Sequence, residues 1–176
     1  MIIEHSITDG DIALRSLDKE TISEGYVSWL NDPEISCFLE SRFQEHTLET
    51  AIGFVEGCNK SSSSLLLGIF YEGRHIGNIK ADINADHKTS GLGLLIGDKS
   101  LQGKGIGSKA ITMLGRYLFE KFDIFKTNAG IYQSNISSIK AFEKAGFEIE
   151  YVKHDHIINK DGDREDVIMM VKYASE

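Results

Sequence analysis

The chain has 176 residues, 41% of them apolar, which is enough for one domain with a buried core. Its 19 lysines and arginines against 27 aspartates and glutamates give a net charge of −8, which disfavours binding to nucleic acid or to an anionic membrane surface. Cys37 and Cys58 form no C-x-x-C pair, no signal-like leader is present, and no apolar run approaches the roughly 20 residues of a membrane helix, so we expect a cytoplasmic protein with reduced thiols.

The N-terminal third predicts one strand followed by three helices. Residues 12–17 are typical of a strand, and apolar residues then recur at helical spacing over 22–30, up to the Asn31-Asp32-Pro33 stop. A second short helix is expected over 34–39. Thr47 can cap a third helix that ends near Gly57.

The rest of the chain alternates strands and helices. A hairpin is expected over 65–71 and 74–84, followed by a strand over 89–97. A strongly periodic helix over 108–122, a strand over 125–133, a helix over 135–145 and a final hairpin that turns at 160–162 complete the order. This order predicts an α/β (α+β) arrangement without an internal repeat or a domain linker.

The most informative segment is the glycine-rich run 102–107, which follows the strand over 89–97 and opens the helix over 108–122. Glycines let several backbone N–H groups point into one concavity, and the positive end of the helix dipole then favours a phosphate or pyrophosphate. The run does not fit a P-loop, because Lys104 is followed by Gly105. It matches G-x-G-x-x-A poorly in context, since five residues separate it from the strand.

The pattern Gln-x-x-Gly-x-Gly at 102–107 resembles the acyl-CoA pyrophosphate loop of the GCN5-related N-acetyltransferases (GNAT). A second segment, 135–147, is similar to the next signature of that family: Asn135 ends a strand, a small residue comes three later, an aromatic seven later, and Glu-Lys-x-Gly-Phe closes the helix. The resemblance covers about residues 74–173. It is nearest to the branch of ribosomal-protein and amino-sugar or small-amine acetyltransferases.

This resemblance implies a GNAT-like fold with a mixed, mostly antiparallel sheet of about seven strands, flanked by helices and splayed at the acetyl-CoA site. One acetyltransferase domain would span 1–176, with acceptor-side helices in 1–60 and the acetyl-CoA-binding core in 64–173. Acetyl-CoA would be the co-substrate, and no metal is expected, because His154 and His156 have no third convergent ligand. The implied cofactor-binding residues are Leu94, Leu95, Ile96, Gln102, Gly103, Lys104, Gly105, Ile106, Gly107, Ser108, Asn135 and Ser138.

The resemblance leaves the proton-transfer groups open. Gly91 stands where relatives often have a glutamate base, and Phe142 stands where many have a tyrosine acid. Ser138 matches the branch in which a serine contacts the CoA sulfur, and its hydroxyl can stabilise a thiolate. His87 and Asp82 are candidates for the base, with bulk water as the alternative.

Family members usually bind the acceptor with their N-terminal third. Trp29, Asn31, Arg42 and Phe43, together with Asn84 of the sheet, are therefore the expected acceptor-binding residues. The expected acceptor is a small amine or a nucleotide-linked amino sugar, reached by direct transfer in a ternary complex. A protein N-terminus is an alternative acceptor, a non-catalytic acetyl-CoA sensor is a further alternative, and a homodimer is possible.

Overall fold

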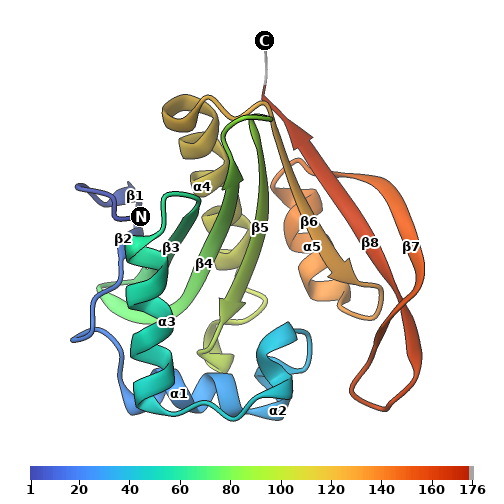
Figure 1. The fold of residues 1–176 in the computed structure, drawn as a ribbon, viewed down its shortest axis with the longest axis horizontal. Helices are drawn as coiled ribbons and strands as arrows, with labels where there is room; N and C mark the ends of the chain where they lie inside the picture. Colours follow the sequence, from blue (N-terminus) through green and yellow to red (C-terminus); the bar gives the residue numbers. More distant parts are fainter. Residues whose placement is uncertain (175–176) are drawn as a thin grey trace.

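A computed structural model describes residues 1–174 of the chain as one eight-stranded sheet covered by helices on both faces (Figure 1). The strands lie in the order β1-β2-β3-β4-β5-β6-β8-β7, and every neighbouring pair is antiparallel except β5 and β6. Their bounds are β1 (Ile7–Asp9), β2 (Ile12–Ser16), β3 (Ser64–Tyr71), β4 (Arg74–Asn84), β5 (Thr89–Ile96), β6 (Lys126–Tyr132), β7 (Glu148–Ile158) and β8 (Arg164–Tyr173).

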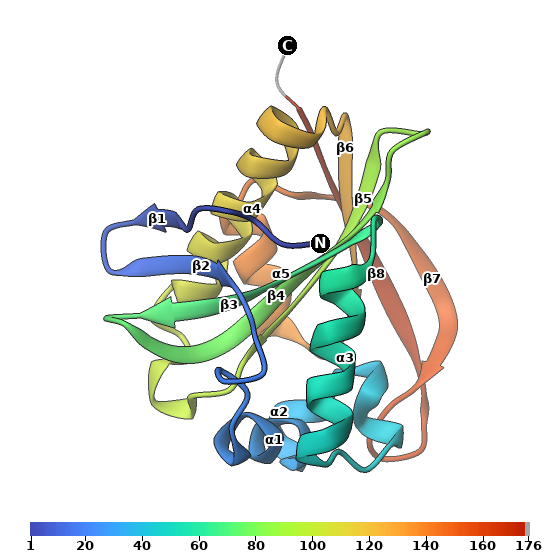
Figure 2. The same cartoon turned by 60° about the vertical axis from the view of Figure 1, so that its left-hand side comes forward.

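The helices divide between the two faces of this sheet. In Figures 1 and 2, α3 lies on one face, and α4 and α5 lie together on the other. The alternation along β3 fits this division, because Leu65 and Leu67 join the larger core with α4, whereas Leu66 packs with α1 and α3. The helical bounds are α1 (Glu24–Asn31), α2 (Pro33–Ser36), η1 (Glu40–Phe43), α3 (Leu48–Lys60), η2 (Lys99–Leu101), α4 (Ile106–Phe122) and α5 (Ile136–Lys144).

The predicted α/β class and the mixed, mostly antiparallel sheet are confirmed, with three differences in detail. The sheet has eight strands, because the three-residue β1 pairs with β2 across the Gly10 turn and is too short to show a periodic pattern. The helix expected over 34–39 ends at Ser36, and a separate 3₁₀ turn follows. The helix α3 continues past Gly57 to Lys60.

The feature that positions the site is the short joint between β5 and β6. Only three residue pairs connect these parallel strands, ending at Gly91 opposite Asn128. A buried hydrogen bond of 2.9 Å between the Ser90 and Thr127 hydroxyls closes the joint. Beyond it the strands diverge, and their carboxyl ends open toward α1 and α2, at the bottom of Figure 1. The predicted splay of the sheet is therefore present.

Among residues 1–174, no helix is both long enough and apolar enough to cross a membrane.

Candidate active site

The edge of β5 that faces the gap carries backbone groups without a strand partner. The Gly97 N–H donates to the Ile76 carbonyl over 2.8 Å, which fixes the phase of the β4–β5 ladder. Alternation along the strand then directs the N–H of Leu95 toward β4, and those of Leu94 and Ile96 toward the gap. Leu94 and Ile96 thus remain candidate donors to a bound cofactor. The expectation for Leu95 is corrected, because the ladder uses its N–H.

The glycine-rich loop has the backbone geometry of an anion site. Gly103 and Gly105 have φ values of 76° and 81°, a backbone conformation that residues other than glycine adopt only with strain. The first hydrogen bond within α4 runs from the Lys109 N–H to the Gly105 carbonyl. The preceding N–H groups, of Ile106, Gly107 and Ser108, therefore have no acceptor within the helix and point out of its N-terminus.

Side chains around the loop hold its shape. Gln102 Nε2 donates to the carbonyl of Ile96 over 3.3 Å, which connects the loop to the end of β5. The Ser108 hydroxyl donates to the Gly105 carbonyl over 2.8 Å, so Ser108 can offer a ligand only its N–H. A Cβ on Gly107 would lie 3.3 Å from Leu94 Cδ1, which places the Leu94 side chain on the α4 face of the sheet.

Lysine side chains supply positive charge near the loop. Lys104 is exposed at the loop, whereas Lys109 of α4 forms an ion pair of 3.2 Å with Asp9. The ammonium of Lys144, at the end of α5, lies 3.4 Å from the position that a Gly105 Cβ would take. Sequence reasoning missed Lys144, because only the packing of α5 beside α4 brings it to the loop.

The first turn of α5 follows the open end of β6. Asn135 Oδ1 accepts a hydrogen bond from the Ser138 N–H over 3.1 Å and another from the Ser137 hydroxyl, so Asn135 acts as the N-cap. The half-buried Ser138 hydroxyl has no hydrogen-bond partner within residues 1–174 and is free for a ligand. Phe142 is buried and packs edge-on against Phe147.

Two of the expected acceptor-binding residues are used for packing and loop structure. The Trp29 ring lies directly against Gly97, where a Cβ would approach a ring carbon to 1.9 Å. Asn31 bonds the backbone of His46 in both directions, at 2.7 and 3.0 Å. Trp29 thus forms a wall beside the end of β5. The expectation that Asn31 binds substrate is corrected, because its amide holds the segment between η1 and α3.

Arg42 also has an internal role that the sequence did not indicate. Its guanidinium donates to the Tyr132 hydroxyl over 2.6 Å and to the carbonyls of Leu39 and Ile158, so it connects η1 with β6 and the β7–β8 hairpin. The Tyr132 hydroxyl in turn donates to a Glu40 carboxylate oxygen over 2.5 Å. Burial, and then the Glu40 bond, raise the pKa of Tyr132.

These bonds give the Arg42 guanidinium an internal structural role, and its expected contact with the acceptor stays a prediction. Phe43 is different: 67% of the residue is exposed, and the Arg42 guanidinium covers its ring at 4.1 Å. Phe43 therefore remains available to an acceptor.

A polar cavity of about 280 Å³ lies where β5 and β6 begin to diverge. Asn78 Nδ2 donates to the Tyr26 hydroxyl, which places the side chains of Asn78, Lys80 and Asp82 on the α1 face of the sheet. The cavity is thus on the face opposite α4 and the glycine-rich loop. It is lined by Lys80, Asp82, Gly91, Leu92, Gly93, Asn128, Ala129 and Gly130.

Of the other expected polar residues, His87 and Asn84 are outside this cavity. Both lie at the β4–β5 turn, beyond the closed end of the gap, and Asn84 Oδ1 accepts the His87 N–H over 3.1 Å. The expectations that His87 acts as a base and that Asn84 binds the acceptor stay predictions, which the position of both residues outside the cavity does not favour. Their pairing is that of a hairpin turn.

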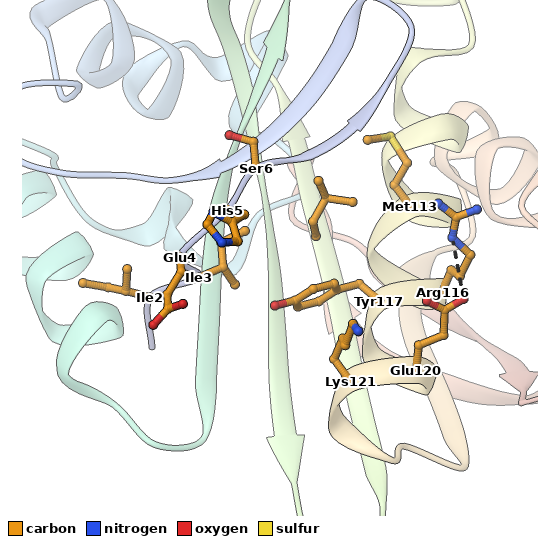
Figure 3. A pocket seen from close by; sticks show the side chains of 11 residues that line it. Ile2, Ile3, Glu4, His5, Ser6, Met113, Arg116, Tyr117, Glu120 and Lys121 are labelled. Carbon is orange, nitrogen blue, oxygen red and sulfur yellow. Dashed lines mark ion pairs between the residues drawn. The ribbon is translucent and has the colours of Figure 1, made fainter.

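A second, larger cavity of about 510 Å³ is remote from the gap. Figure 3 shows it between the N-terminal segment, with Ile2 and His5, and the exposed side of α4, with Tyr117 and Lys121. No residue of the glycine-rich loop or of the β5–β6 gap lines it. Within residues 1–174, no group of three histidine, cysteine or acidic residues is arranged to hold a metal ion.

Comparison with known proteins gives results in line with this geometry. A family model described as "Acetyltransferase (GNAT) domain" matches residues 11–148. A probable spermine N(1)-acetyltransferase from Bacillus subtilis subsp. natto is 28% identical over 88 residues, 47% of this chain and 58% of the relative. An aminoglycoside N(6')-acetyltransferase type 1 from Klebsiella pneumoniae is 35% identical over 63 residues, 36% of this chain and 31% of that protein.

Among solved structures, the ribosomal-protein alpha-N-acetyltransferase RimL in complex with coenzyme A superposes with a TM-score of 0.87. The superposition covers 96% of this chain and 98% of that one at 19% sequence identity, which shows a shared fold. In the sequence comparisons, by contrast, the matched segments span about a third to three fifths of each curated relative.

Proposed function

Because the family model matches residues 11–148, this chain belongs to the GNAT family of acetyltransferases, and we propose that it transfers an acetyl group from acetyl-CoA to a primary amine. The observation that carries the proposal is the gap between β5 and β6, which has the glycine-rich loop on one face of the sheet and the cavity lined by Asp82 and Asn128 on the other. A cofactor anchored at the loop can extend its acyl end through the gap to an amine in the cavity.

The proposed cofactor contacts follow from groups that the fold leaves unpaired. The pyrophosphate would accept hydrogen bonds from the N-terminal N–H groups of α4, with Lys104 and Lys144 supplying positive charge. The amide-containing arm would bond the gap-facing backbone of Leu94 and Ile96, in the manner of an additional strand.

Transfer then needs a stabilised thiolate and a neutral amine. As the amine nitrogen attacks, the carbon–nitrogen bond forms and the carbon–sulfur bond breaks, so the electron pair moves to sulfur. The unpaired Ser138 hydroxyl would donate to that sulfur, and the N-terminus of α5 would favour its negative charge. Cys58 lies on the buried face of α3 and is no candidate nucleophile, which supports direct transfer.

For the acceptor, we propose a small cationic amine. Residues 20–49, which include α1, α2 and η1 at the open end of the gap, contain seven acidic residues and one basic residue, Arg42. This charge attracts a polyamine or an aminoglycoside, the classes named for two relatives, and repels the diphosphate of a nucleotide-linked sugar.

The test measures thiol release from acetyl-CoA with a polyamine, an aminoglycoside, a nucleotide amino sugar and a protein N-terminal peptide. We expect release with the cationic small amines. Ser138→Ala should lower kcat on the order of 100-fold, the cost typical of losing one oxyanion-type donor, with little change in acetyl-CoA affinity.

Ser137→Ala is the matched control, since its hydroxyl is already bonded to Asn135, and it should keep wild-type kcat. Acetyl-CoA binding without thiol release on any acceptor would contradict catalysis and indicate a sensor. Preferential release with the nucleotide amino sugar would refute the acceptor class.

A further inference from the structure

Three residues lie in one row across the strands at the joint of the gap. Asp82 of β4 is the register partner of Gly91 of β5, and Gly91 is the register partner of Asn128 of β6. Residues paired directly across a sheet point to the same face, so all three positions face the polar cavity. The middle position has no side chain, and its two neighbours have polar ones.

The empty position at Gly91 makes room for a ligand. A Cβ built there would lie 3.6 Å from Asn128 Oδ1, and no nearer atom would meet it. Strands are about 4.8 Å apart, so the Asp82 and Asn128 backbones flank a space roughly 10 Å wide. Gly93, where a Cβ would meet no atom within 4 Å, continues this floor, which leaves space for an amine between Asp82 and Asn128.

The hydrogen bonds of Asp82 leave it capacity for one more donor. Its oxygens accept two contacts from Lys80 Nζ, at 2.7 and 2.8 Å, and one from the Ser64 hydroxyl at 3.0 Å. A carboxylate has about four lone-pair sites, so one remains. The Lys80 charge beside it offsets part of the attraction of the carboxylate for a cation, so a bound amine loses its proton more readily than beside an unpaired carboxylate.

Building on the proposed function, we infer that Asp82 and Asn128 dock the acceptor amine in this cavity, and that Asp82 receives its proton. The nitrogen lone pair attacks the thioester carbonyl carbon, and the amine proton passes to the Asp82 carboxylate, directly or through one water, and then to solvent. The electron pair of the carbon–sulfur bond leaves with the thiolate. Asn128 Oδ1 accepts a second N–H of the amine and orients it. The general base would then lie on β4, whereas the family resemblance leads us to expect a glutamate base at the position of Gly91.

Asp82 can be replaced without unfolding the protein. The Lys80 and Asp82 side chains are 31% and 64% exposed, and an exposed pair of this kind contributes about 0.2–1 kcal/mol to stability. Asp86→Asn is a matched control, because Asp86 is an exposed aspartate at the β4–β5 turn and its change removes the same charge outside the cavity.

The experiment compares kcat/KM for the best small-amine acceptor with the acetyl-CoA dissociation constant. Asp82→Asn should lower kcat/KM on the order of 100-fold, as expected for the loss of a general base, at unchanged acetyl-CoA affinity. Asn128→Ala should act mainly through an increased KM for the amine. Asp86→Asn should match wild type.

Rescue separates a catalytic from a structural effect. Gly91→Glu in the Asp82→Asn background puts a carboxylate back into the same cavity. It should raise kcat/KM for the amine at least tenfold above that of Asp82→Asn alone. The inference would be overturned if Asp82→Asn keeps activity within twofold of wild type, or if adding Gly91→Glu to Asp82→Asn recovers no activity. In both cases turnover by the wild type still supports the proposed acetyl transfer. Absence of turnover in the wild type itself would instead refute the proposed function.

Discussion

The left-handed backbone of the glycine loop predicts that one methyl group can weaken cofactor binding without unfolding the protein. Gly103 has a φ of 76°, and a Cβ built there meets no atom within 4 Å, so Gly103→Ala tests the backbone conformation alone. An alanine in this left-handed region costs about 1 kcal/mol or slightly more. Because residues 102–104 are exposed, we expect the free loop to relax and to recover this strain only when acetyl-CoA binds.

The magnitude follows directly. A strain of about 1 kcal/mol that appears only in the complex raises the acetyl-CoA Kd about fivefold, and the melting temperature of the free protein stays within about 1 °C. The control is Gly73→Ala. Gly73 has a φ of 79° and equal space around its Cβ, but it sits in the β3–β4 turn, where Tyr71 pairs with Arg74.

In that tight turn the strain cannot relax before the hairpin unfolds. Gly73→Ala should therefore lower the melting temperature by about 2–4 °C and leave the Kd unchanged. Isothermal titration calorimetry and thermal unfolding of both variants measure the four quantities. An unchanged Kd for Gly103→Ala would refute the view that the loop must be left-handed at this residue to bind the cofactor.

Three further outcomes are expected. Lys144→Met should raise the acetyl-CoA Kd by about three- to tenfold in a salt-dependent way, whereas Lys109→Met should leave it unchanged, because Lys109 is paired with Asp9; equal effects in titration calorimetry would contradict this assignment. Tyr132→Phe should destabilise the protein by about 0.5–1.5 kcal/mol in urea unfolding, since it removes the hydrogen bonds of the Tyr132 hydroxyl with Arg42 and Glu40, and wild-type stability would exclude the network. Burial lowers the pKa of His75, whose Nε2 has no partner within residues 1–174. The unfolded chain then binds more protons below about pH 6.5, so stability falls as the pH falls through that value, and His75→Phe should flatten this part of the profile; an equally steep profile in the variant would show that other groups cause it.

The local elements could be predicted from the sequence because each carries its own signal. The hairpin over β3 and β4 and the long helix α4 are periodic over many residues, and the Gly103 and Gly105 spacing requires a turn before a helix. These signals depend on neighbours along the chain. The strand β1 has no such signal, because three residues are too few to show an alternating pattern, and only their pairing with β2 defines the strand.

The local geometry of the site follows from the sequence, whereas the contacts between distant segments do not. The backbone of the loop and the cap formed by Asn135 follow from local sequence. Arg42 and Asn31 were expected at the acceptor, but the Tyr132 hydroxyl and backbone groups elsewhere in the chain bond their side chains. The sequence gives only a weak signal for Asn128 and Tyr132, which are polar or large residues at alternate positions of a strand. Their roles depend on the register of β6 with β5 and β8, which cannot be predicted from a single sequence.

The short joint between β5 and β6 has a consequence for the lifetime of the protein in the cell. Three residue pairs connect a five-stranded half of the sheet to a three-stranded half, and acetyl-CoA bound in the gap would contact both halves. At a concentration 100 times its Kd, a ligand of the folded state adds about 2.7 kcal/mol to stability. Proteases act on the opened form, and the steady-state amount of this protein is therefore expected to rise and fall with the supply of its own co-substrate.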